Sequence, residues 1–389
     1  MRIAIIGGGV SGLYAAYLLE HQGIRDYVLL EARDVLGGRI MSVAAPGKVA
    51  PEAEAAAIDR FDLGPTWFWP EYQPELYQLI NTLGLEHFEQ FDTGDMMVER
   101  SPYEPLTRMR GDGSSMGAWR LAGGMRSLID ALRHQVDQTR IVTGQTVRYL
   151  RRTLSNIELG SEDASGRITT RHVEHVLLAV PPRLTEGSIK FEPVLPQVLA
   201  YQWRSTATWM ASHAKYVAVY DTPFWREHGQ SGEARSTHGP LVEIHDASLR
   251  GGGGALFGFF GVPARVRKDI SDDILRMHCR AQFTRLFGAQ AAHPCAELIK
   301  DWAQDPYTAT AMDMDMLDHH IPAPSVTAAS GPWHGCLMGI ASEWSPQYPG
   351  YVAGAIEAAR LGVQAVLSSF ATQAVDQGNF GLTNVFHGL

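Results

Sequence analysis

Apolar and polar residues at the start of the chain follow two different periods. Residues 3–6 and 27–30 are short apolar runs, which are typical of buried strands. A glycine-rich turn at 7–12 follows the first run, and residues 13–21 then show the spacing of a helix. The order strand, turn, helix and strand predicts a βαβ unit.

The same patterns predict elements along most of the remaining chain. Helices are expected at 74–83, 124–136, 270–287 and 354–367, and strands at 141–152, 167–179, 216–220 and 296–302. Residues 241–245 and 255–261 are expected to pair as a hairpin, whereas the Ala- and Pro-rich stretch 43–58 is expected to loop out. Periodicity is weak over 86–118. Helices mixed with buried strands place the chain in the α/β class.

Composition and charge narrow the classes of partner. With 389 residues, 45% of them hydrophobic, the chain is long enough for two or three globular domains. The net charge of −9, without a long Lys/Arg run, makes nucleic acid and anionic membranes poor partners. No apolar run is long enough for a transmembrane helix. Three cysteines without a CxxC motif predict neither a disulfide framework nor a zinc site, and fit a cytoplasmic setting.

The strongest chemical signal is the turn Gly7-x-Gly9-x-x-Gly12, followed by Glu31 at the end of the second predicted strand. Glycines allow the backbone to approach a pyrophosphate, which the helix N-terminus attracts through its unpaired N–H groups and its dipole. A carboxylate at the position of Glu31 can accept hydrogen bonds from ribose hydroxyls. The pattern predicts a dinucleotide-binding site.

The residues after Glu31 carry a family resemblance. Gly38 follows Gly37 and precedes Arg39, while Arg33 lies just after Glu31. This arrangement resembles the second glycine motif of the flavin amine oxidase (monoamine oxidase-like) family, whose members hold FAD as a prosthetic group.

The resemblance covers most of the chain and implies further contacts with FAD. The segment 62–67 is similar to the family's segment that lies against the flavin, and Trp67 is a candidate for the substrate pocket. Val147 matches the position whose backbone meets the adenine. The implied flavin contacts in these and the C-terminal segments are Gly64, Pro65, Thr66, Val147, Glu343 and Val352.

Lys215 is the candidate catalytic cation. The segment 214–225 closely resembles the family's strand that runs from the active-site lysine to a Pro-Phe-Trp corner. The resemblance implies that Lys215 contacts flavin N5 through a water molecule. A cation at that place would help oxygen to accept electrons and would stabilise developing negative charge.

Tyr351 is the second candidate catalytic residue. By resemblance, it forms one wall of an aromatic cage in front of the flavin, and the helix from Val352 points its N-terminus at the pyrimidine ring. The chain departs from the family at Ala311 and Met312, where monoamine oxidases have a flavin-linking cysteine and a second cage tyrosine. The departure implies noncovalent FAD and a pocket lined by Met312.

Other polar groups give weaker signals. Asp313, Asp315 and Asp318 with the pair His319-His320 do not follow a metal-ligand spacing, so no metal is predicted. The substrate is left open: an amino acid would require an arginine such as Arg204, Arg235 or Arg250, and a polyamine would require carboxylates such as Glu243 and Asp246.

The resemblance implies a discontinuous Rossmann-type FAD-binding domain from 1–84, 118–200 and 325–372, and an α+β substrate domain from 85–117 and 201–324. The implied reaction is oxidation of the C–N bond of a small-molecule amine, by hydride transfer to flavin N5 and reoxidation by O2 to give H2O2. Two alternatives remain: a flavin-dependent desaturase, dehydrogenase or isomerase acting on a non-amine, and a non-enzymatic flavin-holding protein. The short segment 85–117 leaves room for a homodimer partner to cover the pocket.

Overall fold

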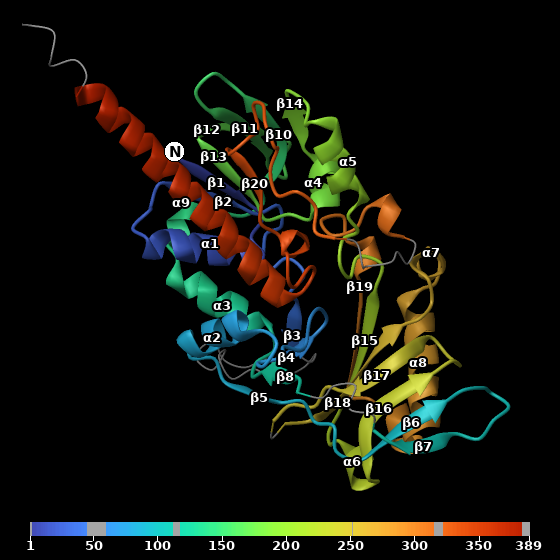
Figure 1. Cartoon of the computed structure of the whole chain (residues 1–389). Coiled ribbons are helices and arrows are strands. Elements are labelled where there is room, and N and C mark those ends of the chain that lie inside the picture. Colours follow the sequence, from blue (N-terminus) through green and yellow to red (C-terminus); the bar gives the residue numbers. More distant parts are fainter. Residues whose placement is uncertain (1, 45–59, 112–116, 251, 315–321, 383–389) are drawn as a thin grey trace, which may run out of the picture. The chain divides into compact units, whose positions relative to one another are not determined.

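The structure is a computed structural model of the chain (Figure 1). It describes residues 2–44, 60–111, 117–250, 252–314 and 322–382, with side chains up to residue 370. Most of the loop predicted at 43–58 lies outside the described residues. None of the described helices is both long enough and apolar enough to cross a membrane.

The chain divides into two compact units. The first contains residues 1–36, 132–206 and 321–389, and the second contains 37–131 and 207–320. Both units are discontinuous. Residues 37–84 and 118–131 belong to the second unit. The family resemblance instead implies that these residues belong to the FAD-binding domain, and that division stays a prediction.

The first unit is built on a parallel sheet of the Rossmann type, with strand order β20-β13-β1-β2-β9. Ile3 of β1 pairs with Tyr27 of β2 on one side and with His175 of β13 on the other. Every residue of β1, β2 and β13 is buried, as expected where both faces of a parallel sheet are covered. Helices α1 and α9 lie side by side (Figure 1). The elements of this unit are β1 (Ile3–Ile6), α1 (Val10–His21), β2 (Tyr27–Leu30), η2 (Gln138–Arg140), β9 (Ile141–Val142), β10 (Thr146–Arg152), β11 (Ile157–Glu162), β12 (Ile168–Val173), β13 (His175–Leu178), α4 (Pro182–Ser188), β14 (Lys190–Glu192), α5 (Gln197–Ser205), β20 (Leu337–Gly339), η6 (Ser342–Trp344) and α9 (Val352–Leu382).

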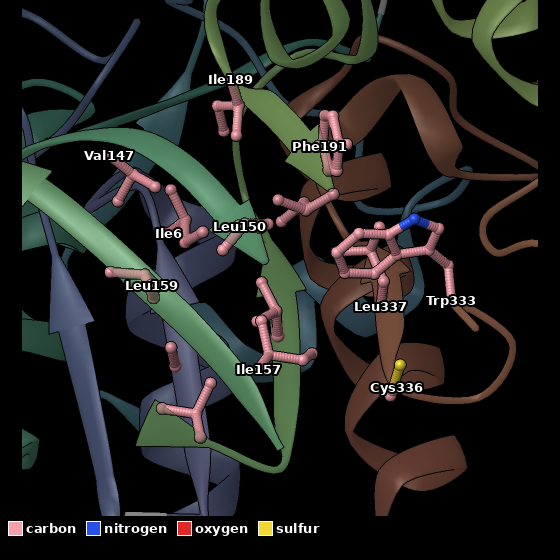
Figure 2. Close-up of a cluster of buried hydrophobic side chains, with 14 of the residues drawn as sticks. Ile6, Val147, Leu150, Ile157, Leu159, Ile189, Phe191, Trp333, Cys336 and Leu337 are labelled. Atoms are coloured by element: carbon pink, nitrogen blue, oxygen red, sulfur yellow. The ribbon is translucent and has the colours of Figure 1, made fainter. Parts of the chain in front are cut away.

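A second sheet of the first unit, β12-β11-β10-β14, shares a core with the parallel sheet (Figure 2). Leu150 and Leu159 of this sheet are fully buried in one cluster with Ile6 of β1. Trp333 and Phe191 meet edge to face at 5.6 Å and extend the same cluster. The burial fixes β1, and with it the glycine-rich turn that follows β1.

The second unit is built on a sheet of seven described strands in the order β19-β15-β18-β17-β16-β6-β7. One face is apolar: Tyr216 and Ala218 of β15 pack with Cys279 and Phe283 of α8. The elements of this unit are β3 (Ser42–Ala44), β4 (Arg60–Asp62), α2 (Pro74–Thr82), β5 (His87–Glu89), β6 (Asp95–Glu99), β7 (Thr107–Arg110), β8 (Trp119–Leu121), α3 (Arg126–Gln135, which continues into the first unit), β15 (Ala214–Tyr220), α6 (Phe224–Glu227), β16 (Gln230–Ser236), β17 (Leu241–Asp246), β18 (Gly254–Phe260), α7 (Ala264–Arg267), α8 (Asp272–Phe287), η3 (Ala289–Ala292), β19 (Ala296–Asp301), η4 (Trp302–Gln304) and η5 (Ala311–Asp313).

The opposite face of this sheet is mixed in character. Residues directly opposite each other in antiparallel strands project from the same face, so Lys215 shares its face with Phe259 of β18 and Lys300 of β19. Farther along the same face, Val217 and Phe257 pack with residues of β4 and the segment after it. This face, defined by the Lys215 row, is called here the lysine face.

Most predicted elements are confirmed, but their limits differ in instructive ways. The strand predicted at 141–152 is divided into β9 and β10 because Gly144, with φ +65°, turns the backbone between them. The α1 helix begins at Val10 rather than at 13, and α9 runs to Leu382 rather than to 367. Strand β16 was not predicted because its sequence, QSGEARS, is polar although it is almost wholly buried.

Candidate functional site

The predicted glycine-rich turn lies between β1 and α1, and two of its glycines are sterically required. Gly7 has φ +107°, and a Cβ there would lie 2.8 Å from the carbonyl oxygen of Ala179. A Cβ on Gly12 would lie 2.0 Å from the carbonyl oxygen of Gly7, so any larger residue must displace the turn. The helix begins at Val10 after Gly9, which offers no side-chain cap. The first N–H groups of α1 therefore have no side chain that competes for them.

Glu31 is buried at the end of β2 and supports this turn. Its Oε2 accepts from the backbone N–H of Gly8 at 2.6 Å, and its Oε1 accepts from the N–H of Arg33 at 2.9 Å. The Arg33 guanidinium is 3.8 Å from the same carboxylate. Because a carboxylate has about four acceptor sites, Glu31 can shape the turn and still accept from a ligand hydroxyl.

The remaining candidates of the first unit lie on three elements. Val147 is buried on β10, next to an irregularity in the pairing of β10 with β11. Glu343 is buried in η6 and accepts from the Ser342 hydroxyl at 3.0 Å. Tyr351 is 41% exposed and directly precedes Val352, the first residue of α9.

The second unit holds Gly38, Arg39 and the segment 64–67. Gly38 has φ +58°, and Arg39 donates from Nη1 to the carbonyl oxygen of Trp209 at 3.1 Å. A Cβ on Gly64 would lie 2.1 Å from the carbonyl oxygen of Arg39, so the two predicted segments pass in backbone contact. Pro65 follows Gly64 and is partly exposed.

Lys215 is the most deeply buried cation of this region, with 1% of its surface exposed. Its Nζ donates to Thr66 Oγ1 at 2.5 Å and to the Gly64 carbonyl oxygen at 3.3 Å. The same Nζ lies 3.9 Å from the centroid of the Phe257 ring, within the range of a cation–π contact. The structure thus brings Lys215 together with Thr66 and Gly64 of the separately predicted segment 62–67.

Aromatic side chains continue from Lys215 along the lysine face. The ring of Trp67 lies 5.4 Å from that of Phe257 and meets the His245 imidazole edge-on at 4.7 Å. The indole N–H of Trp67 donates to Gln90 Oε1 at 2.7 Å, which fixes the orientation of the ring. Trp67 is partly exposed, as a residue lining a substrate pocket must be.

The pKa of Lys215 is unusual for an amine. Burial lowers the pKa from 10.5 to about 7, since the charged form is poorly solvated there. The Asp62 carboxylate acts against this shift, and the Arg120 guanidinium adds to it. Lys215 therefore changes its charge near neutral pH.

Asp62 and Arg120 are buried charged residues that the sequence analysis did not select. The Asp62 carboxylate accepts from the Ser42 hydroxyl and, at 2.8 Å, from the N–H of Met125. Burial raises the pKa of Asp62, and Lys215 is the strongest influence that opposes the rise. The sequence indicated the burial of Asp62 only through its place between two apolar residues, Phe61 and Leu63.

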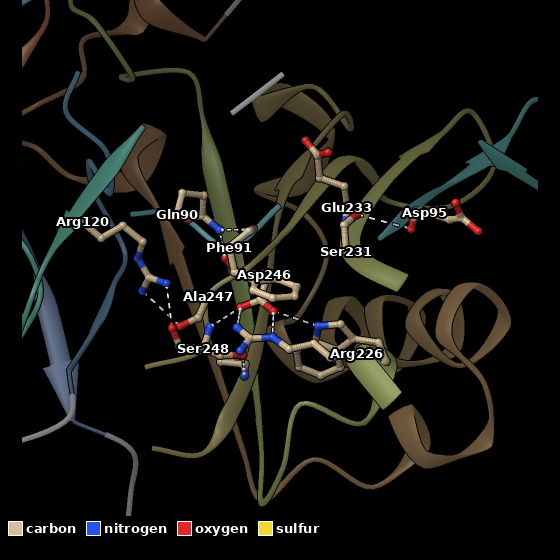
Figure 3. A network of polar contacts seen from close by, with 12 residues as sticks. Gln90, Phe91, Asp95, Arg120, Arg226, Ser231, Glu233, Asp246, Ala247 and Ser248 are labelled. Carbon is tan, nitrogen blue, oxygen red and sulfur yellow. Dashed lines mark hydrogen bonds and ion pairs between the residues drawn. The ribbon is translucent and has the colours of Figure 1, made fainter. Parts of the chain in front are cut away.

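Arg120 is held by backbone carbonyls (Figure 3). Its Nη1 donates to Ser248 O at 2.9 Å and its Nη2 to Ala247 O at 3.0 Å. The neighbouring turn is fixed by Asp246, which accepts from Arg226 in a two-bond pair. Burial lowers the pKa of Arg120, and Asp62 opposes this.

A second polar group, farther along the lysine face, is formed by His245, Glu233 and Glu243. The His245 Nε2 is 2.7 Å from a Glu243 oxygen, and its Nδ1 is 3.3 Å from a Glu233 oxygen. Burial lowers the pKa of His245, but the two glutamates outweigh this and the net direction is upward. Arg235 also pairs with Glu243, so this carboxylate lies against a permanent cation.

The remaining predictions are placed as follows. Met312 lies in η5 and is 49% exposed, and Tyr351 belongs to the first unit whereas Lys215 belongs to the second. No group of three or more potential metal ligands occurs among the described residues. The residues His319 and His320 lie outside the described residues.

Comparison with known proteins decides the family. The model of the family "flavin containing amine oxidoreductase" matches residues 10–118 and 104–367. The chain belongs to this family.

Relatives of the same kind agree with this assignment. A putrescine oxidase of Kocuria rosea is 24% identical over 94% of this chain and 95% of its own length. A probable flavin-containing monoamine oxidase A of Dictyostelium discoideum is 22% identical over 79% of this chain and 84% of its own. This flavin amine oxidoreductase is therefore an oxidoreductase enzyme that acts on amines with a flavin cofactor.

Solved structures confirm the fold of the flavin amine oxidoreductase. A wild-type putrescine oxidase with bound putrescine superposes with a TM-score of 0.76 at 19% identity, covering 94% of this chain and 99% of the other. The cyclohexylamine oxidase of Brevibacterium oxydans also gives 0.76, at 17% identity over 95% and 99% of the two chains. The α/β class predicted from the sequence is confirmed.

Proposed function

We propose that this chain oxidises the C–N bond of a small amine with noncovalently bound FAD and passes the electrons to O2. The observation that carries the proposal is the Lys215 amine, buried against Thr66 and Gly64 and titrating near neutrality. Burying an amine lowers the free energy of unfolding, and buried groups with shifted pKa values are concentrated at functional sites.

The choice of FAD rests on the turn and its carboxylate. Gly12 leaves backbone room at the uncapped start of α1, which suits a diphosphate, and Glu31 retains acceptor sites for a ribose. When bound, the flavin supplies the acceptor for a hydride from the substrate's α-carbon and returns the electrons to O2. The residues proposed to hold it are Gly7, Gly9, Gly12, Glu31, Arg33, Gly38, Arg39, Gly64, Pro65, Thr66, Val147, Glu343 and Val352.

Noncovalent attachment is supported by the chemistry of the side chains. The three cysteines are Cys279, Cys295 and Cys336, and Ala311 stands where the resemblance places the linking thiol. Cys279 lies on the buried side of α8, and burial raises its pKa, so it is a poor nucleophile.

The substrate side is proposed to be the lysine face, with Trp67 as one wall. Tyr351 and Met312 are proposed as substrate-pocket residues on the family resemblance alone. Trp67, Phe257 and Phe259 present aromatic surface next to Lys215. The carboxylates beyond them already have partners, Arg235 and His245 for Glu243 and His245 for Glu233, with which a second ammonium group would compete. This favours a monoamine with an apolar body over a diamine such as putrescine.

The test is anaerobic reduction of the flavin by a panel of monoamines, diamines, polyamines and amino acids. We expect bleaching of the flavin absorption with arylalkyl monoamines, and at least tenfold slower bleaching with putrescine, about 1.4 kcal/mol in transition-state stabilisation. Lys215→Met should slow reduction or reoxidation. Bleaching by no amine, in a protein that is yellow, would contradict the proposal and favour a non-amine substrate or a non-enzymatic role.

Three further proposals follow from the same reading. The FAD-binding domain comprises 1–84, 118–200 and 325–372, and the substrate domain 85–117 and 201–324. The protein works in the cytoplasm, and a homodimer partner completes the cover of the pocket. Sedimentation of the purified flavoprotein tests the dimer.

A further inference from the structure

We propose that Arg235 is a specificity-determining residue: its guanidinium occupies Glu243, the carboxylate of the lysine face that would otherwise bind the second ammonium group of a diamine. This role rests on the proposed function, because it has meaning only if an amine is oxidised beside Lys215. From the sequence, Arg235 was a candidate for binding an amino acid and Glu243 for binding a polyamine. The structure pairs the two candidates with each other.

Glu243 and Arg235 belong to the same cross-strand row as Lys215. Lys215 of β15 is opposite Phe259 of β18, and Phe259 is opposite Glu243 of β17. Glu243 is in turn opposite Arg235 of β16. Directly opposite residues of antiparallel strands project from the same face, so these side chains share the lysine face. Glu243 is two strands from Lys215, which corresponds to about 10 Å between their backbones.

Aromatic rings connect Lys215 with this carboxylate. The Lys215 Nζ lies 3.9 Å from the centroid of the Phe257 ring and 5.6 Å from that of Phe259. The His245 imidazole lies 5.4 Å from the Phe257 ring, and its Nε2 is 2.7 Å from a Glu243 oxygen. A substrate with its amine beside Lys215 and an apolar chain along these rings would therefore direct its far end at Glu243.

Glu243 is the accessible carboxylate of this group. Its side chain is 33% exposed, whereas that of Glu233 is 4% exposed. The Arg235 Nη1 lies 2.5 Å from Glu243 Oε2, and the Arg235 side chain is 37% exposed. A partly exposed ion pair contributes little to stability, so Arg235 can be replaced without leaving a deeply buried charge.

The charges around Glu243 indicate what would take the place of Arg235. Among the described residues, the cationic partners of Glu243 are Arg235 and His245. Without Arg235, Glu243 would keep only His245, whose single charge is shared with Glu233 at 3.3 Å. Burial alone would raise the pKa of Glu243, but His245 and Arg235 lower it to about 2, so the carboxylate is charged at neutral pH. An ammonium group could then neutralise its exposed end.

The test compares two substrates of equal chain length, heptylamine and hexamethylenediamine, which have a methyl and an ammonium group at the far end. Anaerobic flavin reduction in the holoprotein gives the ratio of their second-order rate constants. We expect Arg235→Gln to raise the diamine-to-monoamine ratio about tenfold or more, because attraction to Glu243 replaces repulsion by Arg235. The change should appear in the diamine concentration that gives half-maximal reduction rather than in the limiting rate, since the far end is remote from the reacting carbon.

Three further variants separate a specific role from a general effect of charge. Arg235→Lys keeps a cation beside Glu243 and should keep the parental ratio. Adding Glu243→Gln to Arg235→Gln should abolish the gain. Arg280→Gln removes the same charge from α8, where Arg280 pairs with Glu297, and should leave the ratio unchanged. If Arg235→Gln does not fold, Arg235→Met, which keeps the apolar stem of the side chain, gives the same comparison.

A second measurement records binding without turnover. The diamine α,α,α′,α′-tetramethylputrescine has no hydrogen on the carbons that bear its amines, so it cannot lose a hydride there. Calorimetry of the holoprotein with this compound therefore measures affinity alone. We expect it to bind about tenfold more tightly to Arg235→Gln than to the parent.

An unchanged substrate ratio in Arg235→Gln, together with unchanged affinity for the tetramethyl diamine, would overturn the proposal. A gain that survives the addition of Glu243→Gln would also overturn it, because the second ammonium would then bind elsewhere. If no amine reduces the parental flavin, the proposed function is wrong, and the calorimetric comparison still decides whether Arg235 blocks a cation site at Glu243.

Discussion

Two candidate functional regions, one in each unit, differ in how they are built. In the first unit, the turn between β1 and α1 requires glycine, since a Cβ at Gly7 or Gly12 would collide with backbone atoms. In the second unit, the Lys215 site depends on side chains that are present, charged and almost fully buried. The first region is a bare backbone surface of the kind that suits a diphosphate. In the second region, the state of the site depends on the charges of buried side chains such as Lys215.

This difference predicts different sensitivities to mutation. A backbone surface fails when volume is added, and it tolerates the loss of a polar side chain. A site built from buried charges is also disturbed by changes of side-chain volume. Its stability and function are most sensitive to a change of charge, and the size of that effect depends on pH. The following changes test the contrast.

The largest effect is expected from Gly12→Val. The added Cβ would lie 2.0 Å from the Gly7 carbonyl oxygen, so the turn must move away from its present position. We expect flavin affinity to fall by about 100-fold or more, since overpacking of this kind costs on the order of 3 kcal/mol. Titration of the apoprotein with FAD, followed by flavin fluorescence, measures it.

Gly187→Val is the matched control for added volume. Gly187 lies in α4 of the same unit, and a Cβ there would meet nothing within 4 Å. Flavin affinity should stay at the parental value in this variant. Equal losses in the two variants would show that the turn is not the flavin-binding surface.

The contrast also explains how much the sequence could predict. Gly7, Gly9, Gly12 and Glu31 stand within one short segment, and a backbone constraint of this kind leaves a local spacing that can be read directly. Strand β1 and the hairpin of β17 and β18 were predictable for a similar reason, since their apolar patterns are local.

The charged neighbours of Lys215 were not predictable in this way. Asp62, Arg120 and Lys215 come from three distant segments, and no spacing in the sequence indicates that the fold buries all three. Lys215 itself was recognised from its flanking residues. Strand β16 was missed because polar residues such as Gln230 and Glu233 are buried there by tertiary packing, against their usual preference.

Among the changes of charge, the largest effect is expected from Lys215→Met on the pH dependence of stability. The pKa of Lys215 is about 7 in the folded protein and 10.5 in its ordinary state, so between these values the unfolded chain binds more protons. Parental stability should therefore rise with pH in that window, by up to about 1.4 kcal/mol per pH unit. Below about pH 7 the folded parent buries a charged amine, which lowers its free energy of unfolding. The methionine variant, which has no charge there, should be more stable than the parent in that range.

Guanidinium unfolding of both proteins at a series of pH values measures this difference. The advantage of Lys215→Met should shrink as pH rises. Lys300→Met is the control, because its amine on the same sheet face pairs with Asp305 and is partly exposed. A constant difference between parent and Lys215→Met from about pH 7 to 10 would mean that the amine is not neutral in the folded protein.

The smallest effect on flavin binding is expected from Ser11→Ala, which removes a polar side chain from the backbone-built turn. The Ser11 hydroxyl is buried and donates to the carbonyl oxygen of Ile340, so its loss should lower the free energy of unfolding by about 1–3 kcal/mol. The N–H groups at the start of α1 are untouched, and flavin affinity should stay within about threefold of the parent, since threefold is under 1 kcal/mol. Unfolding curves and a flavin titration on the same preparation measure the two quantities. A loss of affinity comparable with that of Gly12→Val would place a side chain, rather than the bare backbone, at the centre of flavin binding.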